Sequence, residues 1–447
     1  MATPRPPADR PLRLGVLGCG NVGSRFVELV DTEGQSVAQR TGIGLEVTRI
    51  AVRDAAKPRA DFPDQAGLEK RLTEDAASVV VDPDVDLVVE LIGGIEPART
   101  LVLRALAAGK PVVSANKELL ASNAGELLAA AGVAGVDLLF EASVAGAIPL
   151  VRLLNESLAG EHITRLSGIV NGTTNYVLTR MSEDGLEYSE ALGEAQQLGY
   201  AEADPTADVE GYDAAAKAAI LAGIAFDADV VASDVFREGI TNIGPDDIAF
   251  ARRLGYEVRL LAVAERTSPP EGETGSSRHP GISVRVHPAM VPQTHPLASV
   301  RGPFNAVFLD GAAAGELMVY GRGAGGLPTA SAVLGDVIDA AHHLREGGRG
   351  RAVRRRAPAL TPMLALRTQY YLSIDVLDRP GVLAAVASLF GEHDVSIRSM
   401  EQVGLRGEAR LLFITHSALE ADMQATLRAL SDLDVVERVR CMLRIFS

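Results

Sequence analysis

The sequence contains few cysteines and no long uninterrupted apolar stretch. Its 447 residues include two cysteines, Cys19 and Cys441, which lie far apart in the chain. We therefore expect free thiols in a reducing cytoplasm rather than a disulfide framework. The first ten residues are rich in proline and lack the apolar core of a signal peptide. No run of about 18 apolar residues predicts a membrane-spanning helix.

Positive charge is also in short supply. Lysine and arginine total 43 against 58 aspartates and glutamates, which gives a formal net charge of −15. This excess of acid argues against nucleic acid and anionic membranes as partners. Arg345 to Arg356 holds six arginines among glycines. We interpret this run as a solvated linker, because no aromatic residues are interleaved with it as in a nucleic-acid site.

The first predicted elements are a strand, a glycine-rich turn and a helix. Leu12 to Leu17 reads as a short apolar strand, and it leads into Gly18-Cys19-Gly20-Asn21-Val22-Gly23. Glycines in this pattern let the backbone approach a pyrophosphate, and the N-terminus of the following helix attracts its charge. The segment predicts a Rossmann-like dinucleotide site. The alternative is a glycine-rich turn in some other α/β domain.

The end of the second predicted strand bears on the choice of cofactor. Leu45 to Asp54 closes on Arg53 and Asp54, and Lys57 and Arg59 follow. An acid here would hold a ribose 2′-hydroxyl, whereas a cation suits a 2′-phosphate. Because the cations outnumber the acid, we expect NADP(H) to be preferred and NAD(H) to be accepted. The alternative is that Arg53 is simply a solvated strand end.

Two more strands extend this parallel sheet. Val85 to Gly94 is almost continuously apolar, as in a strand covered on both faces. After the next short strand, Asn116 and Lys117 stand at its carboxyl end, where open α/β sheets bind ligands. A lone lysine there would more often be solvated. The candidate cofactor residues on these two strands are Ile92, Gly93, Ser114 and Lys117.

Gly199 to Lys217 combines many acids with a single lysine. Its charged residues are Glu202, Asp204, Asp208, Glu210, Asp213 and Lys217. Pro205 and Gly211 should break regular structure before Asp213. The Ala-rich run after Gly211 predicts a buried helix, on which Asp213 and Lys217 share one face. An acid beside an ammonium suits a substrate with an amine to hold and an oxygen to protonate. The alternative is a surface ion pair.

The stretch Ala195 to Lys217 resembles the signature of homoserine dehydrogenases, and Gly168 to Met181 resembles a second segment of that family. The resemblance implies reversible reduction of aspartate 4-semialdehyde to homoserine with NAD(P)H, in threonine and methionine biosynthesis. It implies that Lys217 donates the proton and that Asp213 assists it. The residues implied to bind the substrate are Glu202, Asp208, Asp213 and Lys117.

The resemblance also implies a cation site and a second cofactor loop. A monovalent cation, expected to be sodium, would be held by Glu141 and by the backbone of Val144, Gly146 and Ile148. Backbone and carboxylate oxygens are the ligands that hard cations take. The alternative is an ordinary turn before a helix. Gly323 and Gly325, in the loop before the helix at 326–346, would lie against the dinucleotide.

The last segment of the sequence reads β-α-β-β-α-β. Its first turn resembles that of ACT domains, where amino acids bind. Proline at a helix start and an exposed glycine amide suit a carboxylate. The candidate regulatory residues are Asp378, Pro380, Gly381 and Val382. We expect threonine as the effector and a domain that can be removed without loss of catalysis. The alternative is a domain used only for assembly.

The predicted fold is therefore α/β with three domains. These are a Rossmann-like domain at 11–150, a mixed α/β substrate and dimerisation domain at 151–325, and an ACT domain at 368–447, with a linker at 347–367. In the second domain, Thr173 or Thr174 is expected to cap a helix, and 268–280 to form a mobile hairpin. A homodimer or homotetramer is expected. Two alternatives stay open: another NAD(P)-dependent amino-acid oxidoreductase, and a non-catalytic amino-acid sensor.

Overall fold

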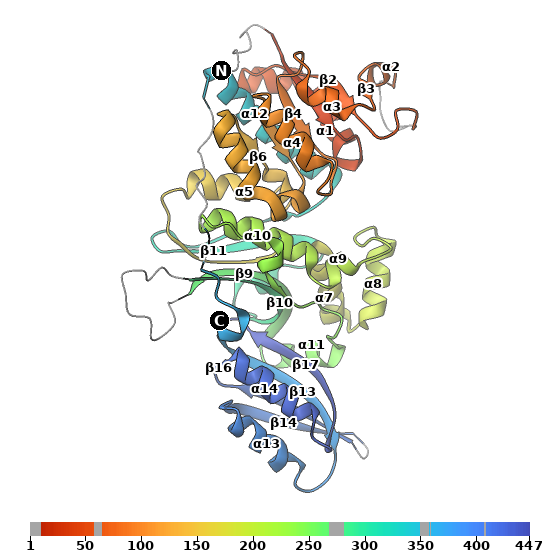
Figure 1. The fold of residues 1–447 in the computed structure, drawn as a ribbon. Coiled ribbons are helices and arrows are strands. Elements are labelled where there is room, and N and C mark those ends of the chain that lie inside the picture. Colours follow the sequence, from red (N-terminus) through yellow and green to blue (C-terminus); the bar gives the residue numbers. More distant parts are fainter. Residues whose placement is uncertain (1–9, 58–64, 268–280, 349–356, 358, 406–407) are drawn as a thin grey trace, which may run out of the picture. The chain divides into compact units, whose positions relative to one another are not determined.

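A computed structural model of the chain describes residues 10–57, 65–267, 281–348, 357, 359–405 and 408–447 (Figure 1). The predicted hairpin at 268–280, Arg59 and most of the arginine-rich linker lie outside these residues. The chain divides into two compact units, each described by itself. The first comprises Met1–Ile163, Ala219–Ser233 and Val319–Pro358; the second comprises Thr164–Ala218, Asp234–Met318 and Ala359–Ser447.

The first unit is built on a parallel sheet. Within the described residues it has six strands in the order β3-β2-β1-β4-β5-β6. Their bounds are β1 Leu12–Leu17, β2 Leu45–Ala51, β3 Leu72–Thr73, β4 Leu87–Glu90, β5 Val112–Ser114 and β6 Leu138–Leu139. The strand order reverses at β1, which pairs with β2 on one side and with β4 on the other. Such a switch point is where open α/β sheets bind ligands.

Helices cover this sheet. They are α1 Asn21–Thr41, α2 Gln65–Glu69, α3 Ala76–Val81, α4 Ala98–Ala107, α5 Lys117–Ala134 and, much later in the chain, α12 Gly326–Glu346. α12 packs beside α1 (Figure 1), and its buried Val333 and Val337 join Phe26 and Val30 in one apolar core. A helix from the far end of the sequence is thus part of the first unit.

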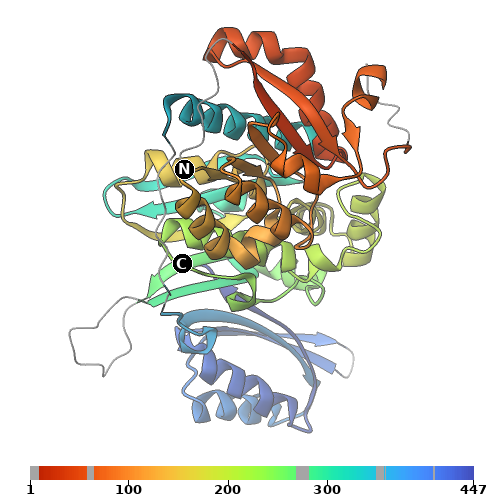
Figure 2. The ribbon, with the colours of Figure 1, turned by 45° about the horizontal axis from the view of Figure 1, so that its top comes forward.

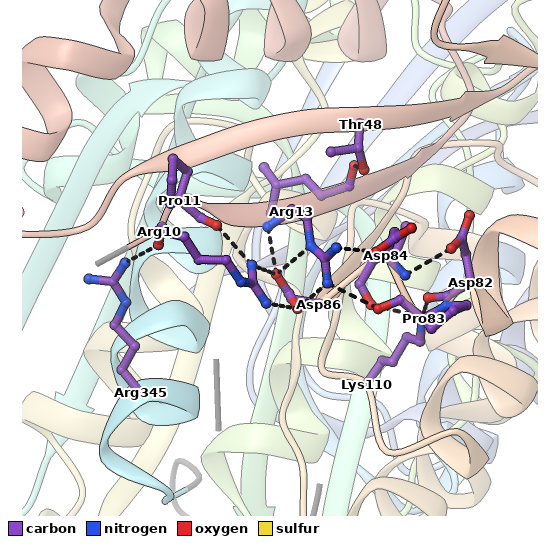
Figure 3. A network of polar contacts seen from close by, with 12 residues as sticks. Arg10, Pro11, Arg13, Thr48, Asp82, Pro83, Asp84, Asp86, Lys110 and Arg345 are labelled. Carbon is purple, nitrogen blue, oxygen red and sulfur yellow. Dashed lines mark hydrogen bonds and ion pairs between the residues drawn. The ribbon is translucent and has the colours of Figure 1, made fainter. Parts of the chain in front are cut away.

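An ion network closes the amino ends of β1 and β4 (Figure 3). Nη1 and Nη2 of Arg10 lie 2.6 and 2.9 Å from the carboxylate oxygens of Asp86, which also accepts the backbone N–H of Arg13 at 2.8 Å. Burial raises the pKa of Asp86, but the hydrogen bonds from Arg10 and Arg13 outweigh it and hold that pKa below its ordinary value. The network fixes the end of the sheet opposite the glycine-rich turn.

A second, mixed sheet runs through the second unit. Its path is β12-β11-β7-β9-β10-β17-β13-β15-β14, with β8 beside β10 and β16 beside β13. The strands that precede the last segment in sequence are β7 Ile163–Ile169, β8 Phe236–Arg237, β9 Tyr256–Thr267, β10 Gly281–Pro292, β11 Phe304–Gly311 and β12 Gly315–Arg322. The accompanying helices are α7 Gly172–Asp184, α8 Tyr188–Gln197, α9 Thr206–Val209, α10 Tyr212–Ala225 and α11 Pro245–Arg253.

The last segment has the predicted β-α-β-β-α-β order. Its elements are β13 Arg367–Leu377, α13 Val382–Glu392, β14 Ile397–Leu405, β15 Glu408–Thr415, β16 Ala418–Leu419, α14 Glu420–Ser431 and β17 Val436–Ile445. α13 and α14 cover one face of the strands (Figures 1 and 2), and Val386, Phe390 and Met423 bury themselves against Phe413. The predicted α/β class, with a Rossmann-like sheet and this terminal fold, is confirmed.

The last segment is joined to the rest of the second unit by strand pairing. β17 pairs in parallel with β10, so that Arg444 lies opposite Ala289 and Ile445 opposite Met290. Phe446 is buried in the same apolar core as Leu261 on β9. Cutting the chain before the segment would expose the edge of β10 and remove part of that core. We therefore expect such a cut to cost stability, while the survival of catalysis after removal of the segment stays a prediction.

Candidate active site

The glycine-rich turn joins β1 to α1 and fits a dinucleotide. A Cβ atom on Gly18, whose φ is 100°, would lie 2.7 Å from the Leu91 carbonyl oxygen; a Cβ atom on Gly23 would lie 2.2 Å from the Gly18 carbonyl oxygen. Neither contact can be accommodated, so both positions require glycine. Gly20, the N-cap of α1, faces open space. The turn therefore leaves room for a pyrophosphate at the helix N-terminus. Neither Cys19 nor Cys441 is in a disulfide.

The carboxyl ends of β4 and β5 are held together by Glu90. Its carboxylate is fully buried and accepts hydrogen bonds from Ser114 Oγ at 2.6 Å and from the Ile92 N–H at 2.8 Å. Asn116 caps α5 and donates to the Gly94 carbonyl at 2.6 Å. Burial raises the pKa of Glu90, although these hydrogen bonds oppose the shift. Glu90 thus positions two of the predicted cofactor residues, Ile92 and Ser114. Gly93 follows Ile92 directly, and Lys117 is the first residue of α5.

The loop before α12 lies beside the same turn. A Cβ atom on Gly326 would lie 2.6 Å from Asn21 Oδ1, so the N-termini of α1 and α12 meet. Gly325 is the N-cap of α12. A Cβ atom on Gly146 would lie 2.7 Å from the carbonyl carbon of Gly323. The structure therefore brings the predicted cofactor loop next to Asn21 and to the predicted cation turn. Val22 packs on the sheet core nearby.

Arg53 follows β2 on the same side of the sheet. It is exposed, as are Asp54 and Lys57. Asp54 accepts the Ala56 N–H at 2.9 Å, which turns the chain away from the strand. The location at the carboxyl end of the second strand is the one that contacts a ribose in dinucleotide-binding sheets.

Lys217, the last residue of the acidic stretch, is held by two hydrogen bonds. Its Nζ atom donates to Asp213 Oδ2 at 2.7 Å and to the Val170 carbonyl at 2.8 Å. Asp213 is 6% exposed and Lys217 is 9% exposed, so the predicted pair on α10 is buried rather than solvated. Such burial rules out an ordinary surface ion pair.

A third residue draws Asp208 into this cluster. Asn171, between β7 and α7, donates through Nδ2 to Asp208 Oδ1 at 2.6 Å and to Asp213 Oδ2 at 2.9 Å. The expectation that Thr173 or Thr174 caps α7 is wrong, because Asn171 is the N-cap and accepts the Thr174 N–H at 2.9 Å. Thr173 Oγ1 instead donates to the Tyr200 carbonyl at 2.6 Å.

The rest of the acidic stretch differs from expectation in one respect. Pro205 does not prevent regular structure, because it stands at the N-terminus of the short helix α9, where proline is tolerated. Glu202 is exposed on the same loop. Within the part of the chain that the structure describes, its carboxylate has no hydrogen bond or ion pair with the cluster. The structure thus gathers Asp208, Asp213 and Lys217 but leaves Glu202 at the rim.

Glu141 begins the predicted cation turn and is buried. Its two carboxylate oxygens accept the N–H groups of Val151 at 2.8 Å and Arg152 at 2.7 Å, so it caps the short helix α6, Leu150–Arg152. Burial raises the pKa of Glu141 despite these bonds. The strand before it, β6, ends at Leu139. Among the described residues, no three His, Cys, Asp or Glu side chains gather at a metal-binding distance.

The turn between β13 and α13 carries the predicted regulatory residues. Asp378, Pro380 and Gly381 are exposed, and Val382 is buried. Gly381 is the N-cap of α13 with φ of 91°, and nothing lies within 4 Å of where its Cβ would be. The turn therefore presents a helix N-terminus to solvent.

Sequence reasoning missed Glu90 and Asn171. Glu90 is an acid inside the apolar run Val85 to Gly94. An acid in a buried strand needs hydrogen-bond partners, so its presence there could have indicated a role in the site. Asn171 stands two residues before Thr173, so three residues that can cap a helix lie within four positions. None of the helices in the described part of the chain is long and apolar enough to cross a membrane.

Comparison with known families accounts for most of the chain. Residues 18–141 match the NAD-binding domain of homoserine dehydrogenase, residues 149–338 match the homoserine dehydrogenase domain, and residues 370–435 match the ACT domain.

Curated relatives match over their full length. The homoserine dehydrogenase of Mycobacterium tuberculosis is 49% identical, covering 98% of this chain and 99% of the relative. That of Bacillus subtilis is 40% identical over 97% and 98%. The crystal structure of a homoserine dehydrogenase from Thiobacillus denitrificans has a TM-score of 0.88 and 38% identity, covering 98% and 99% of the two chains. The chain belongs to the homoserine dehydrogenase family.

Proposed function

We propose that the chain catalyses the reversible NAD(P)H-dependent reduction of L-aspartate 4-semialdehyde to L-homoserine. The observation that carries the proposal is the cluster of buried Asp213 and Lys217 with half-buried Asp208, in a chain that also folds a dinucleotide-binding sheet. A buried ammonium beside carboxylates has a physical use in this reaction, because an aldehyde oxygen must be protonated and an amine must be held.

Lys217 acts as the proton donor. An ammonium has three N–H bonds, and two of them are directed at Val170 and Asp213. The third is left for a substrate oxygen. When the aldehyde carbon receives a hydride, which the nicotinamide cofactor supplies, that oxygen gains negative charge and takes a proton from Nζ. In the reverse direction, neutral Lys217 accepts the hydroxyl proton of homoserine.

The carboxylates bind the amine of the substrate. Asp208 and Asp213 carry two negative charges against the one positive charge of Lys217, so the cluster attracts a further cation. Asp213 also holds Nζ in place. Glu202, exposed on the same loop, serves as an additional contact to the substrate, and Lys117 as a contact at the end of β5.

The direct test is the loss of NADPH absorbance with L-aspartate 4-semialdehyde. We expect turnover on this aldehyde and none on aldehydes that lack the amine. Turnover confined to a different amino-acid carbonyl would favour another oxidoreductase. Amino-acid binding with no turnover on any carbonyl would favour a sensor.

We propose further that NADP(H) is the preferred cofactor and that NAD(H) is accepted. Support comes from exposed Arg53 and Lys57, and from a hyperthermophilic archaeal homoserine dehydrogenase solved with NADPH, which is 27% identical with a TM-score of 0.60. Arg53→Ala should weaken NADPH binding about 10- to 150-fold, as for a hydrogen bond to a charged group, and leave NADH binding unchanged. Arg49→Ala, on β2 itself, is the matched control. Equal losses for both cofactors would mean that Arg53 acts structurally.

We propose a monovalent cation, sodium, at the turn that contains Glu141, Val144, Gly146 and Ile148. Each carboxylate oxygen of Glu141 accepts one amide and keeps a second lone pair, as does the Ile148 carbonyl, which accepts the Leu150 N–H. Replacing sodium and potassium with a bulky organic cation at fixed ionic strength should lower both activity and melting temperature. If neither quantity changes, the turn has no cation.

We propose that the ACT domain binds an amino-acid effector at Gly381, and that the effector is threonine, the product to which homoserine leads. Threonine should inhibit by about 5- to 150-fold, the usual range of allosteric coupling. Gly381→Asp should abolish this inhibition because it places an anion where the carboxylate would bind. Gly381→Asn is the control, since both variants put a side chain at φ of 91°. Equal inhibition of both variants would place the effector elsewhere.

We also propose a cytoplasmic location, a homodimer or homotetramer, and domain boundaries at 11–150, 151–325, 326–346 and 368–447. Cys19 and Cys441, neither in a disulfide, support the reducing compartment. Light scattering measures the assembly directly, and a monomeric mass would contradict it.

A further inference from the structure

The turn between β7 and α7 contacts every member of the cluster formed by Asp208, Asp213 and Lys217. Val170 supplies the carbonyl that accepts Lys217 Nζ at 2.8 Å. Asn171, the next residue, supplies the amide that donates to Asp208 at 2.6 Å and to Asp213 at 2.9 Å. Two consecutive residues therefore fix the ammonium and both carboxylates, and Asn171 is 4% exposed.

The orientation of the Asn171 amide is fixed by the helix that it caps. Its Oδ1 atom accepts the backbone N–H of Thr174 at 2.9 Å and the Thr174 hydroxyl at 3.0 Å. Since Oδ1 faces the N-terminus of α7, Nδ2 must face the carboxylates. Both N–H bonds of Nδ2 are then used, one by each aspartate. A flipped amide would lose the bonds to both aspartates and to the Thr174 N–H, and could keep only the one to the Thr174 hydroxyl.

A neutral donor suits this position for an electrostatic reason. Two carboxylates brought together in a buried site repel each other. An arginine or lysine at position 171 would relieve the repulsion but would also cancel the negative charge that attracts the substrate amine. An amide holds the carboxylates side by side and adds no charge. Asn171 can therefore shape the site while the negative charge of Asp208 and Asp213 remains for the substrate.

We propose that Asn171 is a positioning residue of the active site, which sets the separation of Asp208 and Asp213 and, through Asp213, the location of the Lys217 ammonium. The inference rests on the proposed function. It predicts that substrate binding and turnover both decrease when the amide donors are lost. The reason is that Asn171 holds the amine-binding carboxylates directly and the proton donor through Asp213.

The experiment separates the donor role of Asn171 from its capping role. Serine and aspartate cap helices about as well as asparagine. Asn171→Ser therefore keeps the cap and removes the donors, and Asn171→Asp keeps the cap and adds a third carboxylate. For Asn171→Ser we expect kcat/KM for aspartate semialdehyde to fall about 10- to 150-fold, as for hydrogen bonds to charged groups. Both kcat and the KM for the aldehyde should contribute. Asn171→Asp should lose more.

Two quantities should stay constant in Asn171→Ser, namely the KM for NADPH and the melting temperature. The matched control is Asn175→Ser on the same helix. Asn175 is 1% exposed and donates to the Gly302 carbonyl at 2.9 Å, away from the carboxylates. This variant should lower the melting temperature and leave both KM values unchanged.

The outcomes are distinguishable. If Asn171→Ser keeps the parent kcat/KM, the positioning role is wrong and the proposed function stands. If kcat/KM falls in Asn171→Ser only together with the melting temperature, or if the KM for NADPH changes as much, Asn171 is only a cap and the inference fails. If the parent chain itself does not reduce aspartate semialdehyde, the proposed function fails and the inference falls with it.

Discussion

Two clusters of the second unit can be compared, because each combines two carboxylates with a buried cation. In the first, Asp208 and Asp213 accompany Lys217. In the second, Glu238 and Glu420 accompany Arg444, whose Nε donates to Glu420 Oε2 at 2.9 Å and whose Nη2 donates to Glu238 Oε1 at 3.1 Å. Its Nη1 also reaches Glu238, and its Nη2 also reaches Glu420.

The difference lies in how many donors each cation has left. The guanidinium of Arg444 donates hydrogen bonds to both glutamates. Glu420 also accepts hydrogen bonds from the Tyr370 hydroxyl at 2.9 Å and from Gln424 at 2.9 Å. Lys217 directs two N–H bonds at protein groups. The arginine cluster is closed, and it joins β17 and α14 to the residue after β8. The lysine cluster keeps a donor for a ligand. Composition alone therefore does not separate a cluster whose donors are all used from one that keeps a donor for a ligand.

The closed cluster should respond to mutation through stability. Arg444→Met would leave Glu420, 1% exposed, without its cation. Breaking a buried pair in this way costs about 3–5 kcal/mol. We expect that loss in the free energy of unfolding, measured in urea at neutral pH, with turnover per folded molecule unchanged.

The pH dependence of that loss has a definite sign. Burial raises the pKa of Glu420, but the hydrogen bond and charge of Arg444 outweigh it and bring the pKa below its ordinary value of 4.5. A lowered acid pKa stabilises the folded state above the unfolded value, and the stabilisation is lost as pH falls through the folded value. The difference in the free energy of unfolding between the parent and Arg444→Met should therefore become smaller at acidic pH. A gap that stays constant with pH would mean that the side chain contributes by packing alone.

The open cluster should respond through chemistry. Lys217→Ala should lower kcat at least about 100-fold, the lower end for the loss of a general acid. The KM for NADPH should not change. Lys110→Ala is the control, because Lys110 is a buried lysine that donates to the Val85 carbonyl at 2.8 Å in the first unit. This control should lose stability and keep its turnover. Turnover of Lys217→Ala close to that of the parent would remove the lysine from the mechanism.

The parts of the molecule that the sequence predicts are those set by neighbours in the chain. Gly18 and Gly23 are close together in sequence, and a strand before them with a helix after them defines the turn. Asp213 and Lys217 are four residues apart on α10, so helical periodicity alone places them on one face. Both predictions needed only local geometry, and both agree with the structure.

The parts that sequence could not predict depend on distant pairings. Glu90 meets Ser114 across 24 positions and Asn116 across 26. Asn171 caps α7, rather than Thr173 or Thr174, because β7 pairs with β9 up to Gly168 and fixes where the strand stops. The parallel pairing of β17 with β10 places Arg444 opposite Ala289, although the two residues are far apart in sequence. No local pattern encodes which strand will cover a given sheet edge.

The smallest expected effect on stability concerns Glu238, which belongs to the arginine cluster and lies close in sequence to a contact with the acidic loop. Glu238 binds Arg444, and two residues later the Ile240 N–H donates to the Val209 carbonyl at 2.9 Å, next to Asp208. Since the Glu238 side chain is 35% exposed, solvent screens its ion pair, and Glu238→Gln should cost about 1 kcal/mol or less of stability.

The same substitution should have a larger effect on regulation. Allosteric coupling is a difference in effector affinity between two states of the enzyme, and the contacts from Arg444 through Glu238 to Val209 connect the ACT elements to the acidic loop. We therefore expect Glu238→Gln to raise the threonine concentration needed for half-inhibition while the uninhibited kcat stays at the parent value. Glu265→Gln is the control, because Glu265 pairs with Arg285 on the same sheet at 2.8 Å and is not linked to that loop by these contacts. Equal shifts in both variants would mean that the regulatory signal reaches the acidic loop by another route, and that the closed cluster serves stability alone.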